Sequence, residues 1–185
     1  MPPEFTLRYL RALADLSHER PAALAELEAC FRAGETPGPL EGLMPGRVLT
    51  TTLGYGLDPV VIGFARLWMP WVGKTFDPEA KEGRNAFSSG FRAVQNVLWP
   101  GYDLDLPFGD RRFTTFPFTT WDGPSAFTQG GADVRKIDYE HPQSPWLIRD
   151  ILDELIRIDD DLFLGQALLR VRGRLHRVAW FELRR

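Results

Sequence analysis

Two apolar stretches near the end of the chain, 162–171 and 175–183, are separated only by Arg172-Gly173-Arg174. Branched and aromatic residues on both sides of a short link that contains glycine predict a β-hairpin. Because side chains alternate between the faces of a strand, one face of the first strand carries Phe163, Gly165, Ala167, Leu169 and Val171. Small residues in the middle of that face fit a sheet that curves around a space, as in a small barrel, although a bulge at Gly165 accounts for the same residues.

The first part of the chain predicts a helical hairpin and a linker. Apolar residues recur at helical spacing over 4–16, and Pro21 opens a second helix that ends before Gly34. The segment 34–45 is rich in Gly and Pro, which marks a boundary. We therefore expect an N-terminal helical hairpin over 1–34 and a β-barrel domain over 46–185.

Strand patterns are spread over the rest of the chain. Together with the final hairpin, the segments expected to form strands are 47–55, 71–77, 85–87, 112–121 and 132–140. The segment 92–99 fits either a longer strand or a short helix. Strands and helices do not alternate regularly, which argues against a parallel α/β sheet. The expected fold class is mainly β (α+β), an antiparallel barrel of about seven to eight strands. The helical hairpin precedes it in the sequence, and two helices are inserted between its strands.

The two inserted helices are expected over 58–69 and 145–157. In the second helix, Ser144 and Pro145 stand at the first positions, where helices favour them. Ile148, Ile151, Leu152 and Leu155 would share its buried side. Asp150, Asp153 and Glu154 would lie on its solvent side. They could pair as acid and base, but their spacing fits ion pairs of Asp153 with Arg149 and Arg157 better.

Charge and composition exclude several classes of protein. The chain has 22 basic and 25 acidic residues, and a nucleic-acid-binding protein usually has a basic excess. Its longest apolar runs are shorter than the ~18 residues of a membrane span, so we expect no stable membrane insertion. The N-terminus has no basic segment followed by an apolar run, and a cytoplasmic protein is the default.

Motifs for metals, cofactors and catalysis are absent. The chain has three histidines, His18, His141 and His176, which lie in different segments, and Cys30 is its single cysteine. None of these residues has metal-ligand spacing or a nucleophile signature, and no phosphate-binding glycine loop occurs. We expect no metal, no cofactor and no assignable catalytic residue, although a single histidine such as His176 can hold a haem. Cys30 is interpreted as a core residue of the second helix.

Two features suggest a ligand site. Trp71-Val72-Gly73-Lys74 combines an aromatic ring, a glycine that permits close approach and a cation, as the mouth of a cavity would. Arg177 would face inward if Leu175, Ala179, Phe181 and Leu183 do, and a buried guanidinium needs a protein carboxylate or a ligand acid group. A shift of one residue in register would turn Arg177 outward.

Three segments also carry a family resemblance. The residues 71–77 (WVGKTFD), 137–139 (IDY) and 158–165 (IDDDLFLG) resemble motifs of lipocalin-like proteins of unknown function, and the chain is most similar to the bacterial GXWXG-type group. The group's Gly-x-Trp-x-Gly is replaced by Gly46-Arg47-Val48-Leu49-Thr50. The resemblance implies a lipocalin-like antiparallel barrel with an apolar cavity and no established catalytic residues.

These observations favour binding of a small apolar or amphipathic molecule, such as a fatty acid or an isoprenoid, in the barrel. The residues expected to line the site are Trp71, Lys74, Phe116, Phe118, Tyr139, Phe163, Gly165, Ala167, Arg177 and Phe181. An enzyme acting on such a ligand is an alternative, with acid–base residues among Lys136, Asp138, Tyr139 and Asp150. A second alternative is an interaction module that docks a partner or forms a homodimer through the N-terminal helices.

Overall fold

The structure is a computed structural model that describes residues 3–52 and 70–185. Two helices come first, α1 (Pro3–Asp15) and α2 (Arg20–Ala33), and two shorter ones follow later, α4 (Phe91–Leu98) and α5 (Trp146–Arg149). The strands are β1 (Gly42–Thr51), β2 (Trp71–Asp77), β3 (Glu82–Ser88), β4 (Leu106–Pro107), β5 (Arg112–Gly123), β6 (Val134–Asp138), β7 (Ile151–Asp159), β8 (Leu162–Val171) and β9 (Arg174–Arg184).

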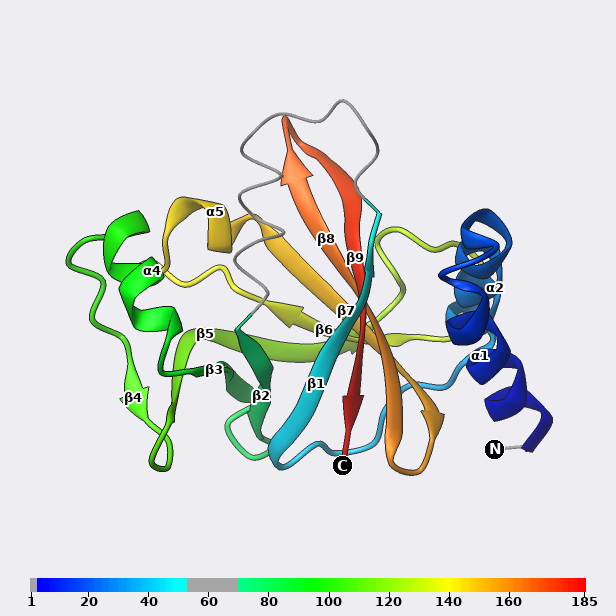
Figure 1. Cartoon of the computed structure of the whole chain (residues 1–185), viewed down its shortest axis with the longest axis horizontal. Helices are drawn as coiled ribbons and strands as arrows, with labels where there is room; N and C mark the ends of the chain where they lie inside the picture. Colours follow the sequence, from blue (N-terminus) through cyan, green and yellow to red (C-terminus); the bar gives the residue numbers. More distant parts are fainter. Residues whose placement is uncertain (1–2, 53–69) are drawn as a thin grey trace.

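The strands form a closed antiparallel barrel (Figure 1). They follow the order β3-β2-β1-β9-β8-β7-β6-β5-β4, and a further pairing of β3 with β5 closes a ring of eight strands in the described part of the chain. The two-residue strand β4 only extends the outer edge of β5. The prediction of a mainly β, antiparallel, lipocalin-like barrel with an N-terminal helical hairpin is confirmed.

The final hairpin forms as predicted. β8 and β9 pair from Leu162↔Arg184 to Val171↔Arg174, so only Arg172 and Gly173 remain in the turn. Both have positive φ, 51° and 78°, which is the backbone of the type I′ turn that matches the twist of paired strands. Phe163, Ala167 and Leu169 point into the barrel core, whereas Leu164 and Trp180 belong to a second core on its outer surface.

Gly165 has a different role from the one expected. A Cβ atom at this position would lie 2.2 Å from the Phe181 ring of the neighbouring strand, so any larger residue would collide with that ring. The prediction that Gly165 borders open space is therefore wrong. The aromatic ring lies over the glycine and fills the gap in the face of the sheet.

The predicted helix 145–157 is also wrong. It starts as expected but ends after the four residues of α5, and the chain continues as β7. β7 lies between the barrel interior and an outer helical layer, so both of its faces are buried and its apolar residues do not alternate with exposed polar ones. Asp153 and Glu154, expected on a solvent face, are fully buried on opposite sides of this strand.

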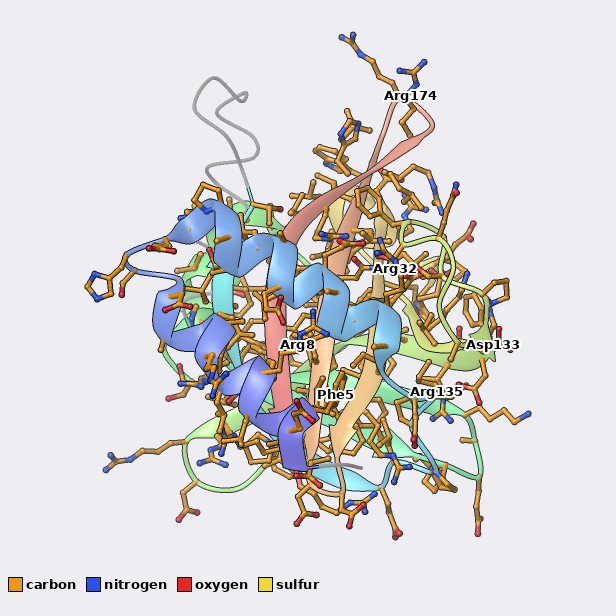
Figure 2. All side chains as sticks on the ribbon, turned by 90° about the vertical axis from the view of Figure 1, so that its right-hand side faces the viewer. Phe5, Arg8, Arg32, Asp133, Arg135 and Arg174 are labelled. Carbon is orange, nitrogen blue, oxygen red and sulfur yellow. The ribbon has the colours of Figure 1, made fainter. Side chains whose placement is uncertain are left out.

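Helices α1 and α2 pack across the outer surface of the barrel, as Figure 2 shows for the face that carries the labelled residues Phe5 and Arg8. Tyr9, Leu27 and Phe31 share a core with side chains of β6 to β9, and the rings of Phe31 and Trp180 meet edge to face with centroids 5.6 Å apart. The apolar face of the helical hairpin is thus covered by the chain's own barrel.

A buried carboxylate ties α1 to β9. Glu182 accepts hydrogen bonds from Tyr9 Oη (2.6 Å), Arg47 Nε (2.7 Å) and Arg184 Nε (3.0 Å). Burial alone would raise the pKa of Glu182, but these three donors together hold it below its ordinary value of 4.5. The ionised form is therefore the one that stabilises the fold.

We expect Glu182→Gln to lower the free energy of unfolding by about 1–3 kcal/mol at neutral pH, because charge-assisted hydrogen bonds are lost. Because the pKa of Glu182 is lower in the folded than in the unfolded state, its ionised carboxylate stabilises the fold above the unfolded-state pKa. This stabilisation is lost as the pH falls through the folded-state pKa. The difference between the wild type and the variant should therefore shrink below about pH 4. Urea unfolding across an acid pH series measures it, and a constant difference would contradict the assignment.

Other expected elements are placed as follows. Segment 92–99 is the helix α4, and β1 begins at Gly42, inside the segment predicted as a linker. Pro117 lies beside a register shift between β3 and β5, in agreement with the edge or bulge that a strand proline requires. The predicted helix 58–69 lies outside the described residues. None of the described helices is both long and apolar enough to cross a bilayer.

Candidate functional site

A cluster of polar side chains lies inside the barrel core. It contains Lys74 from β2, Asn85 from β3, Asp153 from β7 and Tyr139 from the residue after β6, each 4% exposed or less. These residues come from strands around the ring, so they meet only when the barrel closes. Charged residues are rarely buried completely, and such a group is a candidate functional site.

A bulge aims Lys74 into this cluster. Trp71 pairs with Phe87 and Gly73 pairs with Ala86, so β2 has one extra residue at this point. The inserted residue lets Trp71, Lys74 and Phe76 all face the core, which plain alternation would forbid. Gly73 has a φ of 147°, and a Cβ there would lie 2.1 Å from the carbonyl oxygen of Met44.

Gly73→Ala is therefore expected to cost about 2–4 kcal/mol of unfolding free energy, because the new methyl group collides with backbone rather than with a movable side chain. Gly38→Ala serves as the control, since the space around Gly38 is open. Chemical denaturation of both variants measures the difference. Equal stabilities would show that the backbone at Gly73 is not constrained as described.

Hydrogen bonds connect the members of the cluster. Lys74 Nζ lies 2.8 Å from Asp153 Oδ2 and 2.9 Å from Asn85 Oδ1, and it also contacts Tyr139 Oη. Tyr139 Oη donates to Asp153 Oδ2 over 2.8 Å. Trp71 Nε1 donates to Asn85 Oδ1 over 3.1 Å. Ammonium, carboxylate, phenol and amide thus form one connected network.

Aromatic rings surround the ammonium group. Lys74 Nζ lies 5.0 Å from the ring centroid of Tyr139, 5.4 Å from that of Phe118 and 5.5 Å from those of Trp71 and Phe181. The negative faces of aromatic rings attract a cation, so they compensate for part of its lost hydration. The polar cluster is consequently enclosed by aromatic side chains of the barrel core.

Burial shifts the pKa values of the cluster. Desolvation lowers the pKa of Lys74 from its ordinary 10.5, and the attraction of Asp153 opposes this shift without cancelling it. Burial, and then the charge of Asp153, raises the pKa of Tyr139 well above its ordinary 10.0. At neutral pH Tyr139 is therefore a protonated phenol, as its hydrogen bond to Asp153 requires.

One oxygen of the cluster has no partner. Asp153 Oδ1 is buried and makes no hydrogen bond to any described residue, although Oδ2 of the same carboxylate is well satisfied. Across the sheet, Asp153 pairs with Ala167, which in turn pairs with Ala179. The positions beside the carboxylate on the next two strands therefore carry only methyl groups.

The predicted site residues fall into three groups. Lys74 and Tyr139 are members of the cluster, and Trp71, Phe118 and Phe181 surround it. Ala167 lies beside Asp153 on the neighbouring strand, Phe163 lies elsewhere in the barrel core, and Gly165 lies beneath the Phe181 ring. Phe116 packs against Phe91, Trp99 and Tyr102, which belong to α4 and the chain after it.

Arg177 does not face the barrel interior, so that prediction is wrong. The register of β8 and β9 shifts between Ala167 and Leu168, and the extra residue on β9 turns Arg177 outward. There the guanidinium forms an ion pair with Glu28 of α2, stacks over Trp180 at 4.3 Å and donates to Gln166 Oε1 over 2.7 Å. A protein carboxylate supplies the counter-charge that a buried guanidinium needs.

Of the four acid–base candidates, only Tyr139 lies in the cluster. Lys136 lies 3.8 Å from Glu154, which is on the outer face of the barrel. Asp138 accepts a hydrogen bond from the backbone of Glu140, and Asp150 borders a surface groove of about 570 Å³ that also contacts His141, Trp146 and Arg170. No group of three or more potential metal ligands occurs among residues 3–52 and 70–185.

Asp153 and Asn85 are functional candidates that the sequence did not reveal. The sequence pattern places Asp153 on the solvent side of a helix, and Asn85 is an ordinary polar residue in a short predicted strand. The one available signal was Lys74 itself, because a lysine between Trp71 and Phe76 in an apolar strand needs a partner of opposite charge.

Comparisons with known proteins support the fold. The structure is similar to the crystal structure of a protein from Thermomonospora curvata, with a TM-score of 0.52, 14% sequence identity and coverage of 96% of this chain and 97% of that chain. No family model and no curated protein matches the sequence. At this identity the likeness shows a shared architecture over nearly the whole chain.

Proposed function

We propose that the barrel binds a small, mainly apolar molecule whose polar group reaches the Lys74–Asp153–Tyr139–Asn85 cluster. The observation that carries this proposal is the completely buried ion pair inside a shell of aromatic rings. A few convergent polar groups within an apolar lining are typical of small-molecule sites. A fold that needed only stability could replace such a pair by apolar residues at little or no cost.

The lining favours an apolar ligand body. Trp71, Phe118 and Phe181 offer ring surfaces, which suit aliphatic and isoprenoid chains. Arg177, in contrast, is already paired with Glu28 on the outer surface, so it offers no anchor for a fatty-acid head group inside the barrel.

We further propose a cytoplasmic location. Cys30 is a buried free thiol in the core beneath α2, and a reducing compartment keeps such a thiol in this form.

Extraction and probe binding test the proposed function. Purified full-length protein is denatured, extracted with organic solvent and analysed by mass spectrometry, and Nile red is titrated into delipidated protein. We expect a co-purified apolar molecule or saturable Nile red binding that the double variant Lys74→Met/Asp153→Leu weakens. The absence of both a co-purified molecule and saturable Nile red binding would contradict the proposal.

A further inference from the structure

One buried oxygen of the polar cluster, Asp153 Oδ1, makes no hydrogen bond to the described residues. Lys74 Nζ has three protons, and Asp153 Oδ2, Asn85 Oδ1 and Tyr139 Oη already lie around them. Trp71 Nε1 is directed at Asn85, and the Tyr139 proton is directed at Asp153. The fully buried oxygen of the cluster without a partner among the described residues is an acceptor, Asp153 Oδ1.

We infer that the ligand carries a hydroxyl group that donates a hydrogen bond to Asp153 Oδ1. This inference rests on the proposed function and specifies its ligand as an aliphatic or isoprenoid alcohol. An ionised carboxylate only accepts hydrogen bonds, so a group that satisfies Oδ1 has to be a donor. Leaving such an oxygen buried and unpaired is costly, which makes its pairing a strong contribution to affinity.

Electrostatics indicates that the hydrogen-bond donor of the ligand is a neutral group. The carboxylate of a fatty acid would face Asp153 with a like charge in an apolar interior, where repulsion is strong. An alkylammonium group would meet Lys74, whose Nζ is only 2.8 Å from Asp153 Oδ2. A hydroxyl group avoids both conflicts.

The neighbouring positions fit a small polar group with an apolar tail. Ala167 pairs with Asp153 on the neighbouring strand, and Ala179 pairs with Ala167 on the strand after it. Both present only methyl groups toward the core. The rings of Phe181 and Trp71, with centroids 5.7 Å apart and faces nearly perpendicular, stand close to the cluster and suit a hydrocarbon chain.

Matched probes test the inference on delipidated full-length protein. Geraniol and geranic acid differ only in the polar group, as do decanol and decanoic acid, and isothermal titration at neutral pH gives their affinities. We expect each alcohol to bind at least about tenfold more tightly than its acid, the factor that one buried hydrogen bond supplies. Asp153→Asn should remove that preference, because the like charge disappears and the acceptor is weakened.

Two further variants complete the test. Glu154→Gln changes a carboxylate on the same strand that faces outward and should leave the preference intact. If Asp153→Asn does not fold, the double variant Lys74→Met/Asp153→Leu replaces it and should likewise lose the preference. Acids that bind as tightly as alcohols, or a preference that survives these changes, would overturn the inference and leave the proposed function standing. If no probe shows saturable binding, the proposed function itself fails.

Discussion

Asp153→Leu lowers the free energy of unfolding by about 3–5 kcal/mol, because it leaves the Lys74 ammonium buried without its counter-charge. Lys74 is 0% exposed, and Asp153 is its carboxylate partner among the described residues, so solvent cannot replace the lost interaction. Urea unfolding of the wild type and the variant measures the difference at neutral pH.

The double variant Lys74→Met/Asp153→Leu is the decisive control for this prediction. Removing both charges leaves shapes of similar volume, and replacing a buried ion pair by apolar side chains is often neutral or stabilising. We expect the double variant to recover most of the lost stability while losing binding of alcohol probes. A double variant as unstable as Asp153→Leu alone would show that the ion pair serves the fold rather than a ligand.

Trp180→Ala is expected to destabilise the protein by about 3–5 kcal/mol without changing its affinity for decanol. Trp180 is 0% exposed and packs between the barrel and α2, where it contacts Phe31 and Arg177. Its neighbour Phe181 points to the opposite face and lies over Gly165. Phe181→Ala should cost a similar amount of stability and also alter decanol binding.

This adjacent pair separates stability from binding. Both variants are titrated with decanol at a temperature where both are folded, and their unfolding is measured in urea. Trp180→Phe is a milder companion, because the indole Nε1 has no acceptor among the described residues and its removal costs less than about 1.5 kcal/mol. Equal effects of Trp180→Ala and Phe181→Ala on affinity would contradict the assignment of the two faces.

Local patterns predicted the final hairpin correctly. The type I′ turn at Arg172 and Gly173 and the apolar residues on both sides are encoded within consecutive residues, and strand pairing across a short turn follows from them. The helical hairpin was equally visible, since Phe5, Tyr9 and Leu13 in the first helix and Leu27 and Phe31 in the second recur at helical spacing.

The error at β7 has a physical cause. A strand buried on both faces loses its period-two pattern, and Ile151, Leu152 and Leu155 fit a helix continued from Ile148 of α5 as well as they fit this strand. Asp153 then looked like a solvated helix residue, although its partner Lys74 lies 79 positions earlier in the sequence. The candidate site depends on closure of the barrel, which local patterns do not encode.

Arg177 illustrates the sensitivity of strand register. A single extra residue near Ala179 was enough to move the guanidinium from the predicted interior to the outer surface beneath α2. No residue in this stretch of the sequence predicts the bulge. The Ala167 and Ala179 methyl groups nevertheless remain inside, next to the carboxylate that the sequence did not identify.

The indole N–H resonances in a heteronuclear NMR titration with decanol test the central proposal most directly. Trp71 Nε1 bonds to Asn85 in the interior cluster, whereas Trp180 faces the helices and Trp121 and Trp146 are exposed. We expect the Trp71 resonance to shift saturably while that of Trp180 stays in place. A Trp71 resonance that does not move, or shifts confined to Trp121 and Trp146, would show that the barrel interior does not bind the ligand.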